Sequence, residues 1–193
     1  VQMSASGAIP AGATRARISV ILQQQLDFTD PMNPVYRGGS VRYDDASLTI
    51  GSGSNLLVNA SFENICPRVF FDWQGWNGVD HYSQVEVRTG QYSDKVYGPF
   101  FYPGNSGGLW QDLPATPGSQ WQGSVYYLSR VDDQISADID ARIRLEFLDN
   151  VNTSLAPVDA FQSVDIAQGP ATPSTWTRVT TPLAVAPPNT VKV

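Results

Sequence analysis

The sequence has few of the residues that build disulfide frameworks and metal centres. Its 193 residues include one cysteine, Cys66, and one histidine, His81. A single cysteine excludes an internal disulfide framework and a multi-cysteine zinc site, and a single histidine excludes di-histidine metal motifs. These low counts do not exclude chemistry that depends on carboxylates.

Positive charge is also scarce. The chain has 12 Lys+Arg against 18 Asp+Glu, a formal net charge of −6, and lysine only at Lys95 and Lys192. This balance argues against a nucleic-acid groove or an anionic membrane as the main partner. No apolar run approaches the roughly 18–20 residues of a membrane span. Low lysine and cysteine with many Ser, Thr and Asn are typical of an extracellular, bacterial-type protein, so we expect an extracellular or cell-surface location. The chain begins at Val1, and we expect a processed or excised piece of a longer protein.

What the sequence does contain is a series of short β-type runs separated by turn residues. Sixteen Gly and fourteen Pro punctuate runs rich in Val, Ile, Leu and aromatic residues. We predict about nine to eleven short strands and no helix, which favours an all-β sandwich or barrel. The clearest predicted strands are 14–22, 40–50, 84–88, 93–97, 109–113, 120–129 and 138–148.

One predicted strand needs an irregularity. Val41 and Tyr43 alternate on one face of the 40–50 strand, whereas Ala46 and Leu48 continue on that face only if the alternation shifts by one residue. We therefore predict a small irregularity at the Asp44-Asp45 pair. The Gly-Ser segment 51–54 that follows is the clearest linker in the chain.

Several motifs after this linker carry a family resemblance. They are the runs 55–63 (NLLVNASFE), 89–96 (TGQYSDKV), 108–114 (GLWQDLP) and 144–149 (RLEFLD). In this order they resemble jelly-roll carbohydrate-binding modules, the type attached to secreted glycosidases and found in bacterial surface proteins. The resemblance implies a two-sheet antiparallel jelly-roll β-sandwich.

The resemblance also implies that the strand order is rotated. The family's closing strands are missing after Val193 but are similar to 18–22 and 38–48 at the front of the chain. We therefore divide the chain into three parts. Residues 1–50 are closing strands, which complete the sandwich of their own copy, of a preceding copy or of a neighbouring copy. Residues 51–54 are a linker, and residues 55–193 are the main body.

A weak internal similarity suggests tandem copies. Residues 9–14 are similar to 186–191, and aligning Pro10 with Pro187 gives an offset of 187 − 10 = 177, so the chain is one module plus 193 − 177 = 16 residues. A sandwich without its closing strands would expose unpaired edges. We therefore expect a structural or assembly unit, a tandem repeat or the subunit of a filament or surface array, completed by strand exchange with other copies of itself. The alternative function is a glycan-binding module of a secreted enzyme or adhesin, with a polysaccharide as partner.

The resemblance implies a structural calcium site. In the family this ion lies between the Phe-Glu start and the acidic pair of the closing strand, which correspond to Glu63 and to Asp44 and Asp45. Calcium prefers six to eight oxygen ligands. The alternative is that these carboxylates are simply solvated.

Aromatic side chains are the candidates for sugar binding, because flat sugar faces stack on aromatic rings. We select Trp73, Trp76, Tyr82, Phe101 and Tyr102, with Arg88 to bind hydroxyl groups. Core packing or a subunit interface would use the same residue types. By alternation, Trp121 and Trp176 are assigned to packing.

The sequence gives little support to catalysis. Asp132-Asp133 and Asp138 with Asp140 are the nearest carboxylate pairs, but they fall on a turn and on the polar face of a predicted strand. A glycosidase needs two carboxylates about 5–10 Å apart in a cleft. We therefore expect a protein without enzymatic activity.

Overall fold

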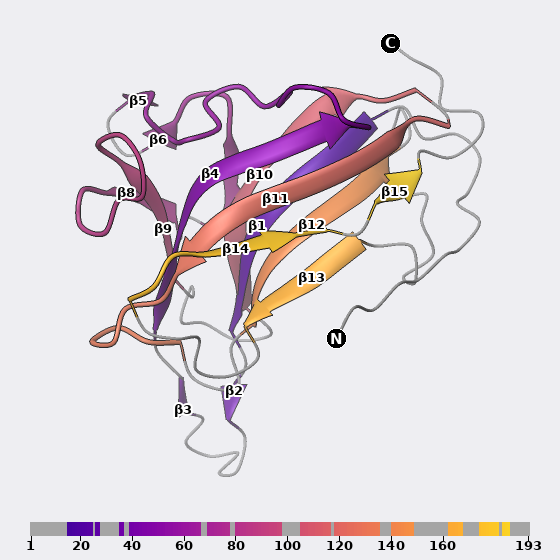
Figure 1. Ribbon diagram of the computed structural model, residues 1–193. Helices are drawn as coiled ribbons and strands as arrows, with labels where there is room; N and C mark the ends of the chain where they lie inside the picture. The colour runs from indigo at the N-terminus through magenta and orange to yellow at the C-terminus, as the bar shows by residue number, and fades with distance from the viewer. Residues whose placement is uncertain are drawn as a thin grey trace.

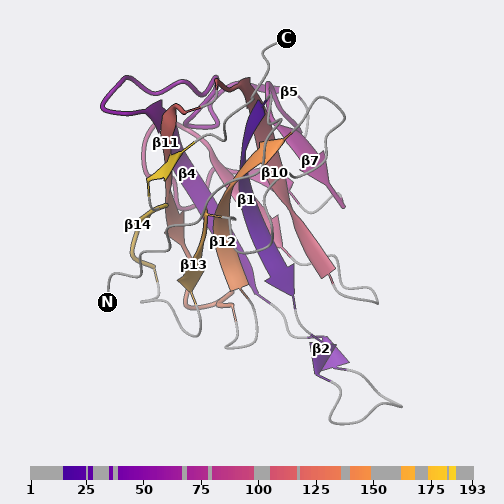
Figure 2. The ribbon, with the colours of Figure 1, turned by 90° about the vertical axis from the view of Figure 1, so that its right-hand side faces the viewer.

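A computed structural model describes most of the chain as two packed β-sheets (Figures 1 and 2). The described residues are 15–24, 26–27, 35–36, 39–66, 69–77, 80–97, 105–116, 118–135, 140–148, 162–167, 174–181 and 183–185. Within these ranges the regular structure is all strand, and the strands of both sheets pair antiparallel. The predicted all-β sandwich is confirmed. The described residues contain no helix with the length and apolar character that a membrane span requires.

The first sheet has five strands. In spatial order they are β13 (Gln162–Ala167), β12 (Asp140–Leu148), β1 (Arg15–Gln24), β10 (Asn105–Pro114) and β7 (Gln74–Trp76).

The second sheet has six strands. In spatial order they are β14 (Thr177–Thr180), β11 (Gln120–Leu128), β4 (Ser40–Ile50), β9 (Ser93–Tyr97) and β8 (Asp80–Ser83), and β15 (Ala184–Val185) also pairs with β11. Two small ladders stand apart from the sheets: β2 (Leu26–Asp27) with β3 (Val35–Tyr36), and β5 (Ile65–Cys66) with β6 (Val69–Phe70). Strands β9 to β12 alternate between the two sheets, which is the connectivity of a jelly roll.

Alternating apolar side chains of both sheets form the core. In β12 every second residue from Ala141 to Phe147 is buried in the core, and the opposite face carries Arg142, Arg144 and Glu146. In β1 the core face carries Ala16, Ile18, Val20 and Leu22, and on the opposite face Ser19 and Ile21 are buried as well. The largest fully buried side chains include Trp121, Tyr43, Phe62 and Phe147. The Tyr43 hydroxyl donates a hydrogen bond to the Ile21 carbonyl oxygen at 2.8 Å and so joins β4 to β1 across the core. The packing role predicted for Trp121 is confirmed.

The two long strands before residue 51, β1 and β4, occupy central positions in the sheets of their own chain. Strand β1 pairs with both β10 and β12, and β4 pairs with both β9 and β11 (Figure 1). The 51–54 segment is a turn: the Gly51 N–H donates to the Gln120 carbonyl, and Gly53 N–H donates to the Ile50 carbonyl. Asn55 then ties the chain back to β4, because its side chain bonds the Leu48 N–H and the Ala46 carbonyl.

The irregularity predicted at the two aspartates is confirmed. The register between β4 and β11 shifts between Ser124 and Tyr126, opposite this pair, and Asp45 has a φ of 47°. The shift returns Ala46 and Leu48 to the core face, where they are 2% and 0% exposed.

One predicted strand is absent, and one predicted strand begins earlier than expected. Residues 84–88 are a loop and not a strand, with Val85 55% exposed and Glu86 at a φ of 61°. Backbone N–H groups near this loop bond carboxylates instead of a neighbouring strand. The strand predicted to begin at Leu109 begins at Asn105. Gly107 and Gly108 belong to it because they pair with β1.

Candidate functional site

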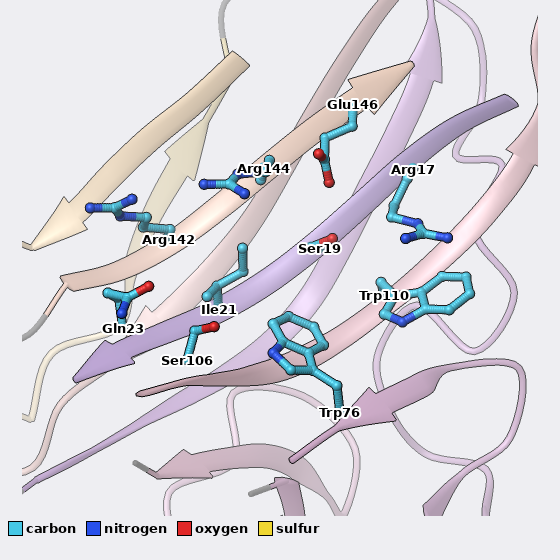
Figure 3. A pocket seen from close by; sticks show the side chains of 10 residues that line it. All are labelled: Arg17, Ser19, Ile21, Gln23, Trp76, Ser106, Trp110, Arg142, Arg144 and Glu146. Carbon is cyan, nitrogen blue, oxygen red and sulfur yellow. The ribbon is translucent and has the colours of Figure 1, made fainter. Parts of the chain in front are cut away.

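The outer face of the five-stranded sheet carries a groove with a volume of about 390 Å³ (Figure 3). Its lining side chains come from β1, β12, β10 and β7, on the face opposite the core. They are Arg17, Ser19, Ile21, Gln23, Trp76, Ser106, Trp110, Arg142, Arg144 and Glu146.

The strand register arranges these side chains in rows across the sheet. In one row Ile21 lies opposite Arg142 on β12 and opposite Gly108 on β10, which in turn pairs with Trp76. In the next row Ser19 lies between Arg144 and Trp110. In the third row Arg17 lies between Glu146 and Asp112. Tryptophans therefore line one side of the groove and β12 arginines line the other.

Gly108 makes room for the Trp76 ring. A Cβ atom at Gly108 would lie 2.8 Å from the Trp76 Cη2 atom and 1.9 Å from the Val20 carbonyl oxygen. Both contacts are too short for a real Cβ atom. Only glycine at this position therefore allows the Trp76 indole to lie over β10 while β10 stays paired with β1. The ring of Trp76 is half-buried and keeps an accessible surface in the groove.

A charged network fixes the Trp110 end of the groove. Arg17 donates to both carboxylate oxygens of Asp112, at 2.7 and 3.0 Å, and Arg15 donates to the same carboxylate at 3.2 Å. The Arg17 guanidinium lies 3.6 Å from the centre of the Trp110 ring, a cation–π contact. This bidentate pairing and stacking hold both side chains in one orientation.

Glu146 places one carboxylate among these cations. Burial raises the pKa of Glu146, the nearby Arg144 and Arg17 lower it, and Asp112 raises it, with a net upward shift. The groove thus combines aromatic surface, guanidinium donors, two serine hydroxyls and the amide of Gln23. Such a surface can hold a flat, hydroxyl-rich ligand by ring contact and hydrogen bonds.

The structure separates the aromatic candidates selected from the sequence. Trp76 lines the groove. Trp73 belongs to the core: it is 6% exposed, its ring lies 5.0 Å from the Phe62 ring, and its indole N–H donates to the Asn59 carbonyl. Tyr82 packs against the core in an edge contact with Tyr92.

The remaining ligand candidates do not join Trp76. Arg88 lies in the 84–92 loop beside the six-stranded sheet, 3.5 Å from the centre of the Tyr126 ring and paired with Asp45. It lines a separate hollow over β4, β11 and β14, so it cannot act together with Trp76. Phe101 and Tyr102 lie outside the described residues.

The sequence did not single out the arginines and the glutamate of the groove. The alternation of residues 140–148 does place Arg142, Arg144 and Glu146 on the polar face of that strand. The sequence pattern does not show that β1 lies beside β12 and that β10 follows on the other side of β1.

The three predicted calcium ligands converge on one loop, residues 84–92. Asp44 is fully buried and accepts hydrogen bonds from the backbone N–H groups of Asp45, Arg88 and Thr89, at 2.7 to 3.2 Å. Asp45 accepts a bond from the Thr89 hydroxyl and pairs with Arg88. Glu63 accepts the N–H groups of residues 91 and 92 at 2.8 and 3.1 Å.

These contacts test whether the carboxylates fit a calcium ion. Each of their oxygens accepts at least one hydrogen bond or ion pair from the loop or from the Asp45 N–H. Among the residues that the structure describes, no group of three or more His, Cys, Asp or Glu is placed to hold a metal. Burial raises the pKa of Asp44 to about 6, against the lowering effect of the N–H bonds from Arg88 and Thr89. The calcium site stays a prediction of the family resemblance. If the site is present, Ca²⁺ but not Mg²⁺ should raise the melting temperature of protein that has been treated with a chelator.

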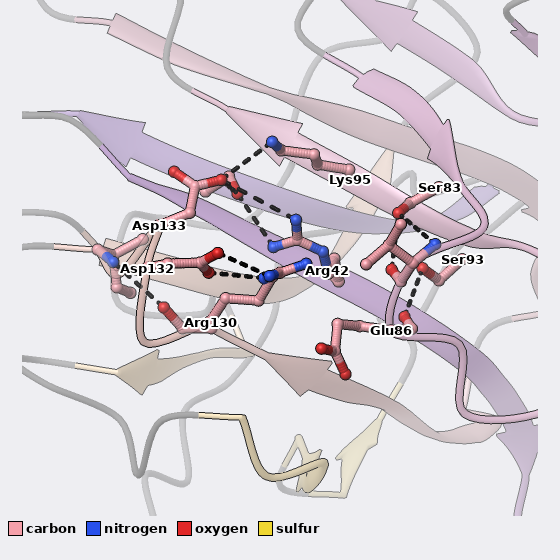
Figure 4. Close-up of polar contacts among 12 residues, drawn as sticks. Arg42, Ser83, Glu86, Ser93, Lys95, Arg130, Asp132 and Asp133 are labelled. Atoms are coloured by element: carbon pink, nitrogen blue, oxygen red, sulfur yellow. Dashed lines mark hydrogen bonds and ion pairs between the residues drawn. The ribbon is translucent and has the colours of Figure 1, made fainter.

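Asp132 and Asp133, one of the two carboxylate pairs considered for catalysis, lie in ion pairs (Figure 4). Asp138 and the side chain of Asp140, the other pair, lie outside the described residues. Asp133 accepts bonds from the Ser40 hydroxyl at 2.5 Å and from Lys95 at 2.9 Å, with the buried Arg42 3.9 Å away. Burial raises the pKa of Asp133, but these donors outweigh it and the net shift is downward. Asp132 is exposed and pairs with Arg130. The cluster ties the loop after β11 to β4 and β9.

Comparisons of the chain with protein-family models, with curated proteins and with solved structures find no match.

Proposed function

We propose that this protein is a non-catalytic, extracellular glycan-binding module whose ligand lies in the groove over β12, β1, β10 and β7. The observation that carries the proposal is that two tryptophans and three arginines from four strands line one face of a sheet. Sugars present alternating apolar faces and hydroxyl edges, which match an indole ring beside guanidinium and amide donors. The resemblance to carbohydrate-binding modules supports the same function.

The Trp76 ring is the main platform for a sugar in this proposal. The Trp110 ring is already stacked with the Arg17 guanidinium, whereas Trp76 lies over the small residue Gly108 with groove volume beside it. Aromatic side chains at the centre of a binding surface contribute about 1–3 kcal/mol when removed, so Trp76→Ala is expected to weaken binding about 10- to 100-fold.

The test is affinity electrophoresis and calorimetry against a panel of soluble polysaccharides, with wild-type protein, Trp76→Ala and Phe71→Ala. Phe71 is the matched control, because it is an aromatic residue 47% exposed that does not line the groove. Melting curves of both variants check that the fold is intact. Retention that Trp76→Ala loses and Phe71→Ala keeps supports the proposal. Absence of retention on every glycan, or equal retention of the two variants, refutes it.

Assembly by strand exchange is the other function that the sequence suggests. It requires the closing strands of one copy to enter the sheets of another. In the structure β1 and β4 already hold two neighbours each in their own chain, so these positions need no second copy. Glycan binding therefore stands first, and exchange is tested by measuring whether the protein is monomeric in solution at micromolar concentration.

A further inference from the structure

The outer face of the six-stranded sheet carries a second hollow, with a volume of about 390 Å³. Its lining comes from strands β4, β11 and β14, from the segment 55–61 and from Arg88. The segment is fixed to β4, because the Ala46 N–H donates to the Ala60 carbonyl oxygen at 2.8 Å and the Asn55 side chain bonds the backbone of the same strand. The hollow therefore has fixed sides, and it lies on the other sheet from the groove.

Arg178 brings a positive charge to this hollow. Its Nη2 atom donates to the Ser124 Oγ atom at 3.1 Å, and no carboxylate in the described part of the chain pairs with it. The other two charged groups of the lining, Asp45 and Arg88, pair with each other. Two arginines and one aspartate give the lining a formal charge of +1, whereas the whole chain has −6. A positive hollow on an acidic protein attracts anions locally.

Ser124 holds an unused hydrogen-bond donor beside Arg178. The residue is 4% exposed, and its hydroxyl oxygen accepts the bond from Arg178. A serine hydroxyl also has one hydrogen to donate. Within the described ranges no acceptor takes this hydrogen. Because a buried donor without an acceptor costs free energy, an acceptor that enters the hollow would stabilise this side chain.

Ser47 adds a donor from a third strand. It lies directly opposite Ser124 in the register of β4 and β11, and side chains opposite one another on one face of such a pair have Cβ atoms about 4.5–5.5 Å apart. Ser47 lines the hollow, and its hydroxyl makes no hydrogen bond to another described residue. A group above Ser124 is therefore within reach of two hydroxyls, from β4 and β11, and of the Arg178 guanidinium from β14.

This set of donors matches a tetrahedral oxyanion. The planar fork of a guanidinium binds two oxygens of a phosphate or a carboxylate. A phosphate ester has three acceptor oxygens, so a third oxygen remains for the serine hydroxyls, whereas a carboxylate has only two oxygens. The volume of the hollow is within the range of small-molecule sites, which leaves room for the group that carries the anion.

We propose that this hollow is a second ligand site, which binds a phosphate or sulfate group carried by a polar molecule such as a sugar ester. The Arg178 fork binds the oxyanion, and the hydroxyls of Ser47 and Ser124 donate to it. This inference goes beyond the proposed function and does not depend on it, because the hollow and the groove lie on different sheets.

The experiment follows backbone amide chemical shifts by NMR while one anion at a time is added at constant pH and ionic strength. The probes are sodium phosphate, sodium sulfate and sodium acetate, followed by glucose 6-phosphate, glucose 6-sulfate and glucose. The variants are Arg178→Gln and Ser124→Ala. Arg130→Gln is the matched control, because Arg130 pairs with Asp132 in the loop after β11 and does not line the hollow.

We expect saturable shifts at residues 47, 124 and 178 with phosphate or sulfate, and weaker binding of acetate. Arg178→Gln should weaken the binding about 10-fold or more and Ser124→Ala about 3- to 10-fold, whereas Arg130→Gln should match wild type. The matching sugar ester should bind at least as tightly as the inorganic anion, and glucose should cause no shift in the hollow. Because Arg178 is exposed, Arg178→Gln should keep the fold, and melting curves check this.

Four results would overturn the inference. They are the absence of saturable shifts with all the anions, equal affinity of wild type and Arg178→Gln, acetate binding as tightly as phosphate and sulfate, and an equal loss of affinity in Arg130→Gln, which would indicate general attraction of anions. Binding of phosphate alone or of sulfate alone supports the site and identifies the ester that it takes. These outcomes leave the glycan proposal unchanged, because Trp76→Ala tests it on the other sheet.

Discussion

Gly108 is the residue at which the fold and the groove depend on one another. It is paired with Ile21 on β1 and with Trp76 on β7, so it lies between a central strand and the aromatic platform. Replacing it with alanine adds one methyl group at a point where two elements approach closely. We predict that Gly108→Ala destabilises the protein and weakens ligand binding together.

The magnitude follows from the two short distances. The new Cβ would lie 1.9 Å from the Val20 carbonyl oxygen, a backbone atom of a strand held on both sides, and 2.8 Å from Trp76 Cη2. Trp76 can rotate away, but Val20 cannot move without separating β1 from β10. Overpacking of this kind costs about 1–3 kcal/mol, and the lower backbone entropy of alanine offsets about 0.5–1 kcal/mol. The expected net loss is about 1–2 kcal/mol, in the upper half of the resulting range, because the contact with the Val20 carbonyl is so short.

The assay is equilibrium unfolding in urea, with Gly123→Ala as the control. Gly123 is also in a central strand, but its added Cβ would meet the Ile18 Cδ1 atom at 3.0 Å, the movable end of a side chain. Gly123→Ala should therefore stay within about 1 kcal/mol of wild type.

The reasoning fails if Gly108→Ala unfolds at the same urea concentration as wild type, or if Gly123→Ala is the less stable of the two. Unchanged stability would mean that β1 and β10 can separate at no cost. Because Trp76 must also move, the stable fraction of Gly108→Ala should bind glycan more weakly than wild type. Intact affinity would show that the close contact does not fix the indole.

Three further changes probe the core, the loop and the groove. Tyr43→Phe removes the hydrogen bond to Ile21 without leaving a large cavity, so urea unfolding should show a loss of about 1–2 kcal/mol; no loss would contradict the cross-core bond. Burial raises the Asp44 pKa from 3.8 to about 6, so its stabilising contribution is full below pH 3.8 and is lost as pH rises through 6. The stability of wild type relative to Asp44→Asn should then fall by roughly 2–3 kcal/mol between pH 4 and 7, and a constant difference would refute the shift. Asp112→Asn weakens the bonds to both arginines and should cost about 1 kcal/mol in thermal unfolding; an unchanged melting temperature would contradict this role.

Local alternation was enough to predict most long strands. The spacing of Val41, Tyr43, Ala46 and Leu48 located the irregularity at the aspartates, because only a one-residue shift keeps all four in the core. The burial of Trp121 followed from the same reasoning. These features depend on residues that are neighbours in the sequence.

Features that depend on distant residues could not be predicted. Val85 and Val87 alternate like a strand, yet Asp44 and Glu63, more than twenty residues away, bind the N–H groups that follow and hold the segment as a loop. Trp73 and Trp76 are three residues apart, and one enters the core while the other enters the groove. No local pattern separates them, because their environments are set by Phe62 and by strand β10.

The groove also connects the two functions that the sequence suggests. Strand β1 supplies its floor through Arg17, Ser19, Ile21 and Gln23, while Trp76 comes from the main body. If copies of this chain exchanged β1, each groove would be built from two chains, and its tryptophans on β10 and β7 would face the β12 arginines across a strand from another copy. Glycan binding would then depend on assembly. Because β1 pairs with β10 and β12 of its own chain, the lining of the groove is complete in one copy.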